Sequence, residues 1–122
     1  MLTQYYDDAL RPVNMRITQY ALLSDINTHP GRSIGELAEA MGMDQTTVTR
    51  NVELLAKSGY IVINHDTGDL RKRNLSLTDS GKIKLSQVEP LWKKAQADVE
   101  KKLGVERYRQ LADLLAELSS IL

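Results

Sequence analysis

The chain has 122 residues, of which 42% are hydrophobic and 26% charged, and 16 Lys and Arg balance 16 Asp and Glu. This composition suits one soluble domain, and no apolar stretch approaches the roughly 20 residues of a membrane span. The absence of cysteine excludes disulfides, thiolate nucleophiles and cysteine metal sites. Because the net charge is zero, affinity for nucleic acid would need a local basic cluster. We expect a cytoplasmic protein without cofactor or metal.

The first third of the chain predicts two helices. Apolar residues recur on one side of residues 2–10, and this helix is expected to end before Pro12. Thr18 is expected to cap a second helix, whose apolar residues continue at helical spacing until the His-Pro-Gly sequence at 29–31. Proline therefore marks the end of both helices.

A pair of helices with a very short connection is predicted next. Ser33 begins the first of them, and Glu36 three residues later completes a capping box. Gly42 is expected to end this helix in the left-handed conformation that glycine tolerates. Asp44 then offers a side-chain cap to a second helix that reaches about residue 57. Two helices joined by so short a turn are typical of a helix-turn-helix.

The second helix of this pair carries polar residues on its predicted outer face. Winding it at about 100° per residue turns Val48 inward and Thr46, Thr47 and Arg50 outward, with Thr49 on the flank. Short hydroxyls at a helix N-terminus suit phosphate oxygens, and the arginine fork suits guanine O6 and N7. The alternative is that the threonines only cap the helix and that Arg50 is a solvated charge.

A β-hairpin with a charged tip follows directly. Strands are predicted over 60–64 and 71–77, with a polar turn at 66–69. Together with Lys82 and Lys84, the Arg-Lys-Arg sequence that begins the second strand gives residues 70–84 a local charge of +4. Arginine is attracted into narrow stretches of the DNA minor groove, so this hairpin is interpreted as a wing. A solvated charge run is the alternative.

Two further helices complete the chain. A long helix is expected from Thr78 to about Lys102, with Pro90 producing a kink and Gly104 ending it. A last helix over 108–122 repeats apolar residues at alternating spacings of three and four, which is typical of a coiled-coil seam. This seam includes Leu111, Leu115, Leu118 and Leu122.

With these elements, the sequence resembles the MarR (multiple antibiotic resistance regulator) family of winged-helix transcription factors over nearly its whole length. The matching segments are YDDALRP, ITQYALL, SIGELAEAMGMDQTTVTRNVELLAKSGYI, DTGDLRKRNLSLTDSGK and PLWKKAQADVEKKLG. The wing is the most specific part, since the family has an acidic residue that orients an arginine two positions later, before a strand that ends in Leu-Thr. Those positions are Asp69, Arg71, Leu77 and Thr78.

The resemblance implies a mainly α fold with a small β-hairpin wing. One domain, 1–122, would comprise a winged helix-turn-helix at about 18–78 and dimerisation helices at about 1–12 and 79–122. It also implies a homodimeric, sequence-specific regulator that binds a pseudo-palindromic operator in double-stranded DNA, represses transcription and is released by a small aromatic effector. The expected DNA contacts are Ser33, Gln45, Thr46, Thr47, Thr49, Arg50, Asp69, Arg71, Lys72 and Arg73. The expected dimer contacts are Leu111, Leu115, Leu118 and Leu122.

Three features depart from the family pattern. Gln45 stands where relatives often have arginine, which is expected to alter one base or phosphate contact. Residues 67–68 are Thr-Gly where relatives commonly have proline and an acidic residue. The chain also begins later than the family's first helix, so either the dimer interface is smaller or the sequence is missing its beginning.

Two other classes of function are alternatives to a DNA-binding regulator. A winged helix that serves only protein contacts would carry apolar residues on the outer face of the fourth helix, where this chain has threonine and arginine. An enzyme is disfavoured because His29 and His65 lie in polar, turn-like stretches without a catalytic partner in the sequence. The aromatic residues Tyr5, Tyr6 and Trp92 are interpreted as core residues rather than as a ligand cleft.

Overall fold

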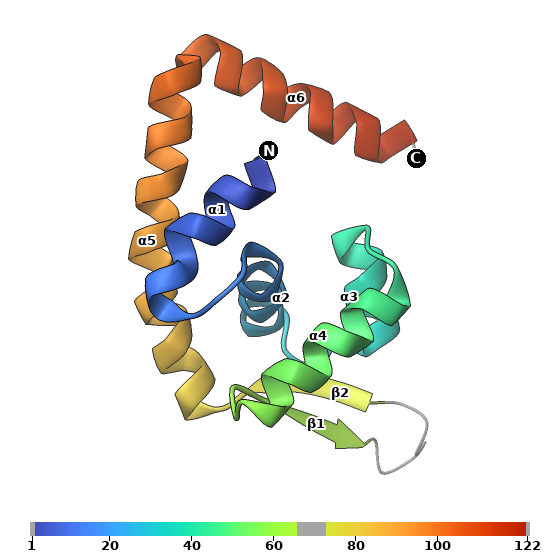
Figure 1. Ribbon diagram of the computed structural model, residues 1–122. Helices are drawn as coiled ribbons and strands as arrows, with labels where there is room; N and C mark the ends of the chain where they lie inside the picture. The colour runs from blue at the N-terminus through green and yellow to red at the C-terminus, as the bar shows by residue number, and fades with distance from the viewer. Residues whose placement is uncertain (1, 66–72, 122) are drawn as a thin grey trace.

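Six α-helices and one β-hairpin follow one another in the computed structural model, which describes residues 2–65 and 73–121 (Figure 1). The elements are α1 (Leu2–Leu10), a 3-10 turn η1 (Arg11–Val13), α2 (Ile17–Thr28), α3 (Ile34–Met41), α4 (Gln45–Lys57), β1 (Ile61–His65), β2 (Arg73–Leu77), α5 (Asp79–Leu103) and α6 (Val105–Ile121). The mainly α fold with a β-hairpin is thereby confirmed. Within the described ranges, no helix is long and apolar enough to cross a membrane.

The start of α2 differs from the sequence-based expectation. The helix begins at Ile17 with Arg16 as its N-cap residue, so Thr18 lies inside the first turn and does not cap it. The Ile17 N–H donates to the carboxylate of Asp7 at 2.8 Å, and the Arg16 N–H donates to the side chain of Gln19 at 3.0 Å. The carboxylate of Asp7 in α1 thus accepts a hydrogen bond from an N–H group of the first turn, in place of a local capping side chain.

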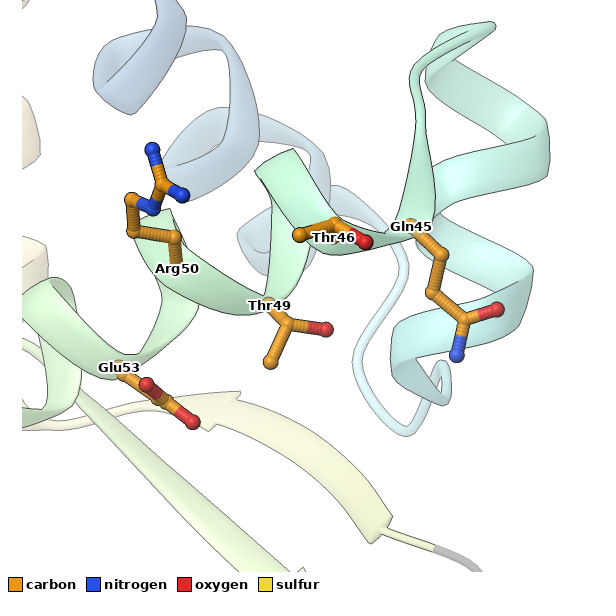
Figure 2. Close-up of a pocket in the computed structure, with 5 residues that line it drawn as sticks. All are labelled: Gln45, Thr46, Thr49, Arg50 and Glu53. Carbon is orange, nitrogen blue, oxygen red and sulfur yellow. The ribbon is translucent and has the colours of Figure 1, made fainter.

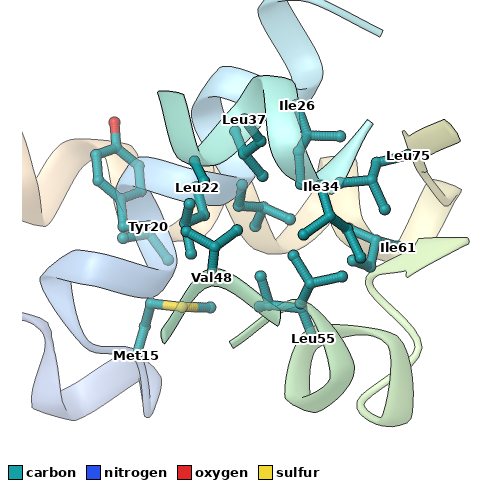
Figure 3. Packing of buried hydrophobic residues seen from close by; sticks show 14 of the residues in the cluster. Met15, Tyr20, Leu22, Ile26, Ile34, Leu37, Val48, Leu55, Ile61 and Leu75 are labelled. Atoms are coloured by element: carbon teal, nitrogen blue, oxygen red, sulfur yellow. The ribbon is translucent and has the colours of Figure 1, made fainter. Parts of the chain in front are cut away.

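The main core lies between α2, α3, α4, the hairpin and the first half of α5 (Figure 3). Its fully buried side chains include Leu22, Leu23, Ile26, Leu37, Val48, Val52, Leu75 and Val88. Val48 and Val52 of α4 are both 0% exposed, which confirms the predicted inner face of this helix. The burial of that face determines which side of α4 remains open to solvent.

The hairpin is attached to the segment that precedes α3. Strands β1 and β2 are antiparallel, in the register that pairs Ile61 with Leu77 and His65 with Arg73. The Gly31 N–H donates to the carbonyl of Leu75 and the Leu75 N–H donates to the carbonyl of Arg32, both at 3.0 Å. A bridge between Ser33 and Asn74 extends this contact. These bonds fix the hairpin beside the helix pair.

The junction between the hairpin and α5 is tight. Thr78 is the N-cap of α5: its hydroxyl accepts from the Gly81 N–H at 3.0 Å and donates to the carbonyl of Gly59 at 2.6 Å. The Thr78 N–H also donates to the carbonyl of Tyr60 at 3.0 Å. Gly81 is buried, and a Cβ atom there would lie 2.0 Å from the Tyr60 carbonyl oxygen. The end of α4, the hairpin and the start of α5 therefore meet at one point.

A second, smaller core joins the two ends of the chain. Tyr6 of α1 packs with Ala95 and Val99 of α5, and the Tyr6 hydroxyl lies 2.6 Å from the Gln96 side-chain oxygen. Helix α5 continues through Pro90 without a break. Helix α6 begins directly after Gly104, three residues earlier than the predicted range, and in Figure 1 it turns at the end of α5 and runs across the top of the molecule above α1.

Candidate nucleic-acid interface

The outer face of α4 forms an open hollow of about 520 Å³, lined by Gln45, Thr46, Thr49, Arg50 and Glu53 (Figure 2). These positions are separated by one, three, one and three residues, so they share one face of the helix. Four of the five were predicted from the sequence as contact residues. Glu53 was missed because on this helix only groups that donate hydrogen bonds or carry positive charge were predicted as contacts, although its spacing of four from Thr49 places it on this face.

The first turn of α4 is capped by its own carboxylate. Asp44 accepts from the N–H groups of Thr46 and Thr47, at 3.3 and 3.2 Å. The Thr47 hydroxyl donates to the same carboxylate at 2.9 Å. These bonds, led by the Thr47 hydroxyl, lower the pKa of Asp44 from its usual value. Two of the N–H groups that were expected to attract phosphate are therefore already bonded, and the exposed Thr47 hydroxyl is bound to the capping carboxylate of Asp44.

The remaining side chains of the hollow have no partner among the described residues. Gln45, Thr46 and Arg50 are exposed and Thr49 is half-buried, and no hydrogen bond or ion pair within the described ranges involves their side chains. Figure 2 shows the guanidinium of Arg50 pointing away from the α4 surface. The hollow therefore presents amide, hydroxyl and guanidinium groups that are free to bind a ligand.

Ser33 lies beside the hairpin at the start of α3. Its hydroxyl accepts from the Glu36 N–H at 3.1 Å, and its own N–H donates to the Glu36 carboxylate at 3.3 Å. The predicted capping box is confirmed. Because the hydroxyl oxygen serves as an acceptor in the cap, the hydroxyl hydrogen of Ser33 remains available to an outside acceptor.

The basic cluster of the wing is only partly within the described residues. The turn at 66–69 and the residues Asp69, Arg71 and Lys72 lie outside them, and for Arg73 only the backbone is described. Lys84 does not belong to an exposed cluster as expected. Its ammonium group donates to the carbonyl of Val13 and lies 5.7 Å from the centre of the Tyr60 ring, so it links α5 to the α1–α2 connection.

A second cavity lies between α2 and α5. It measures about 380 Å³, and its lining includes Ile17, Tyr20, Asp25, His29, Met41 and Trp92. The Tyr20 and Trp92 rings lie 5.8 Å apart, and burial is the main cause that raises the pKa of Tyr20. Asp25 binds Arg32 at 2.8 Å and approaches His29 at 3.4 Å. Trp92 packs against both cores as expected, but it also lines this cavity.

The predicted seam of α6 is exposed in the single chain. The exposed fractions are 36% for Leu111, 55% for Leu115 and 54% for Leu118, and Leu114 beside them reaches 62%. Leu122 lies outside the described residues. Large apolar side chains in such a row on one helix typically mark a protein contact surface.

Among the described residues, no cluster of three His, Asp or Glu side chains that could hold a metal is found.

Comparison with known proteins supports the same architecture. The profile of the MarR family matches residues 15–72. The M. tuberculosis regulator MosR, solved in complex with DNA, is 32% identical with a TM-score of 0.81, covering 98% of this chain and 89% of MosR. The repressor CouR, bound to a 23-mer DNA duplex, is 23% identical with a TM-score of 0.88, covering 97% of this chain and 84% of CouR.

A third neighbour is BpsR from Bordetella bronchiseptica, whose DNA binding is regulated by 6-hydroxynicotinic acid. It is 19% identical with a TM-score of 0.87, covering 97% of this chain and 84% of BpsR. CouR and BpsR show the shared fold, whereas MosR is close enough in sequence to show the family. The helix pair, the wing and the matched profile together establish that this chain belongs to the MarR family of winged-helix transcriptional regulators.

Proposed function

We propose that this chain is a homodimeric repressor of transcription that binds a pseudo-palindromic operator in double-stranded DNA. The observation that carries the proposal is the hollow on α4, where unpartnered polar side chains lie opposite a fully buried face. An outer face of this kind suits the base edges of a major groove. It argues against a winged helix that serves only protein contacts. MosR and CouR, which share this fold, were solved with DNA.

Within this proposal α4 is the recognition helix. Arg50 reads a guanine, while Gln45, Thr46 and Thr49 contact neighbouring base edges or phosphates. Ser33 and Thr47 approach the phosphate backbone of the DNA. The Thr47 hydroxyl must first break its hydrogen bond to Asp44 before it can donate to a phosphate. In the wing, Asp69 orients Arg71 toward the minor groove, and Lys72 and Arg73 add sequence-independent attraction.

Dimerisation is assigned to the two ends of the chain. Residues 1–12 and 79–122 form the dimerisation part and residues 18–78 the winged helix-turn-helix, all within one domain. The exposed α6 seam of Leu111, Leu115 and Leu118, together with Leu122, pairs with a second copy. Two-fold symmetry then places the two α4 helices in successive major grooves, about 34 Å apart.

The cavity between α2 and α5 is proposed as the effector site. It lies where the dimerisation part meets the DNA-binding part, and two aromatic rings and an ionic cluster line it. A small aromatic compound that separates α2 from α5 would change the spacing of the two α4 helices and release the operator. BpsR, whose DNA binding responds to 6-hydroxynicotinic acid, is a neighbour regulated by such a compound.

Titration of the purified protein against its own upstream promoter DNA tests the proposal. The expected result is a saturable gel shift that resists competition by unrelated duplex DNA and weakens steeply as salt rises. Binding of equal strength to every duplex, or no binding at low salt, would contradict it.

A further inference from the structure

Glu53 is the one carboxylate among the residues that line the α4 hollow. It is exposed, and within the described ranges no hydrogen bond or ion pair holds it. Lys57, four residues later, has the spacing of a common helical ion pair, but no such pair to Glu53 is formed within those ranges. On the shared face of α4, Figure 2 shows the Glu53 carboxylate and the Arg50 guanidinium pointing apart, and no ion pair joins them within the described ranges.

A free carboxylate in this position has few favourable contacts with DNA. An ionised carboxylate only accepts hydrogen bonds, so it cannot bind phosphate oxygens and is repelled by their charge. The donors on the base edges of the major groove are the amino groups of cytosine N4 and adenine N6. Adenine presents its N7 acceptor beside that amino group, and this lone pair repels a carboxylate. Cytosine N4 has an acceptor on one side only, the O6 of its paired guanine, and a C–H group on the other, so it is the more favourable partner.

We propose that Glu53 is a specificity-determining residue that accepts a hydrogen bond from the N4 amino group of one cytosine in each half-site. The proposal rests on the DNA-binding function proposed above. Glu53 lies three positions after Arg50, which corresponds to a rise of about 4.5 Å along the helix axis. That rise is close to the 3.4 Å step between base pairs. The cytosine therefore lies about one step from the guanine that Arg50 reads.

Two substitutions at this position separate base reading from simple repulsion. Glu53→Gln keeps the size of the side chain and adds an amide donor, which complements the N7 and N6 groups of adenine. The preferred base at this one position should therefore change from cytosine to adenine. Glu53→Ala removes the contact and should lower discrimination at the same position about five- to tenfold, the lower part of the range for a base contact. Because Glu53 is exposed, both variants should fold normally.

Selection from a pool of randomised duplexes, followed by titration of the selected sites, measures these preferences. Glu39→Gln is the matched control. Glu39 is an exposed carboxylate of α3, so this substitution removes the same charge without altering the α4 hollow. The control should leave every base preference unchanged. If Glu53→Ala instead tightens binding to all duplexes by one factor with an unchanged selected sequence, the carboxylate only repels DNA and the proposal is wrong. If the wild-type protein itself selects no sequence, the proposed function is wrong as well. The failure of the Glu53 proposal alone is therefore distinguishable, because the wild-type protein then still selects an operator.

Discussion

Gly81 offers a test in which two identical substitutions should have opposite effects on stability. Replacement of a helical glycine by alanine normally stabilises a helix by up to about 1 kcal/mol, because glycine loses more backbone entropy on folding. At Gly81 the added Cβ would lie 2.0 Å from the Tyr60 carbonyl oxygen and 2.9 Å from the Tyr60 carbonyl carbon. Both atoms belong to the backbone, so they cannot move aside as a flexible side chain can.

The magnitude follows from this distance. Carbon and oxygen atoms in contact are separated by roughly 3.3 Å or more, so α5 and β1 would have to move apart by about 1 Å. Such a shift disturbs the three hydrogen bonds of Thr78 at the same junction. We expect Gly81→Ala to lower the free energy of unfolding by about 2–4 kcal/mol. This loss is as large as, or larger than, the loss that overpacking substitutions usually cause.

Gly35→Ala is the control, since its Cβ would meet only the Ser33 hydroxyl oxygen at 3.9 Å, an ordinary contact. It should leave stability unchanged or raise it by up to about 1 kcal/mol. Urea unfolding at one fixed protein concentration measures both variants, because the stability of a dimer depends on concentration. If Gly81→Ala is as stable as Gly35→Ala, the close approach of α5 to Tyr60 is wrong.

Four further predictions concern function. Arg50→Ala should weaken binding to the preferred operator by about 1–3 kcal/mol and relax one base position, as measured by fluorescence anisotropy; equal losses on all sequences would make it a phosphate contact. Leu115→Glu should yield monomers or aggregates in sedimentation, because it places an unpaired charge in the proposed dimer interface. Asp69→Ala should weaken operator binding if, as proposed, the carboxylate orients Arg71 before DNA arrives; tighter binding would show that the carboxylate only repels phosphate. A small aromatic compound that releases the protein from its operator should change the fluorescence of Trp92, the single tryptophan, and an unchanged spectrum with such a compound would contradict the proposed effector site.

Features that depend on neighbours in sequence were predictable. The caps at Ser33 and Asp44 use side chains within three residues of the N–H groups they bind, so their spacing alone indicates both helix starts. The inner face of α4 follows from helical periodicity, and the burial of Val48 agrees with it. Thr46, Thr49 and Arg50 of the hollow were identified for the same reason, whereas Gln45 was identified through the family resemblance.

Features that depend on distant contacts were not predictable in this way. The first turn of α2 receives the carboxylate of Asp7, ten residues before Ile17, so a local cap at Thr18 was the wrong expectation. Lys84 was counted with the wing because it is near it in sequence. Its partner, the Val13 carbonyl, lies 71 residues away and becomes its neighbour only in the folded chain. A charge count along the sequence therefore overestimates the exposed cluster.

The anchoring of α5 at Thr78 has a mechanical consequence. Helix α5 has 25 residues, so at 1.5 Å per residue it is a rod of about 37 Å that is fixed at one end to the hairpin and carries α6 at the other. A rotation of about 5° at the fixed end moves the far end by about 3 Å, nearly the length of one base-pair step. The bonds around Thr78, together with the packing of α5 against α1 and α2, therefore limit how much variation in half-site spacing the proposed dimer could tolerate.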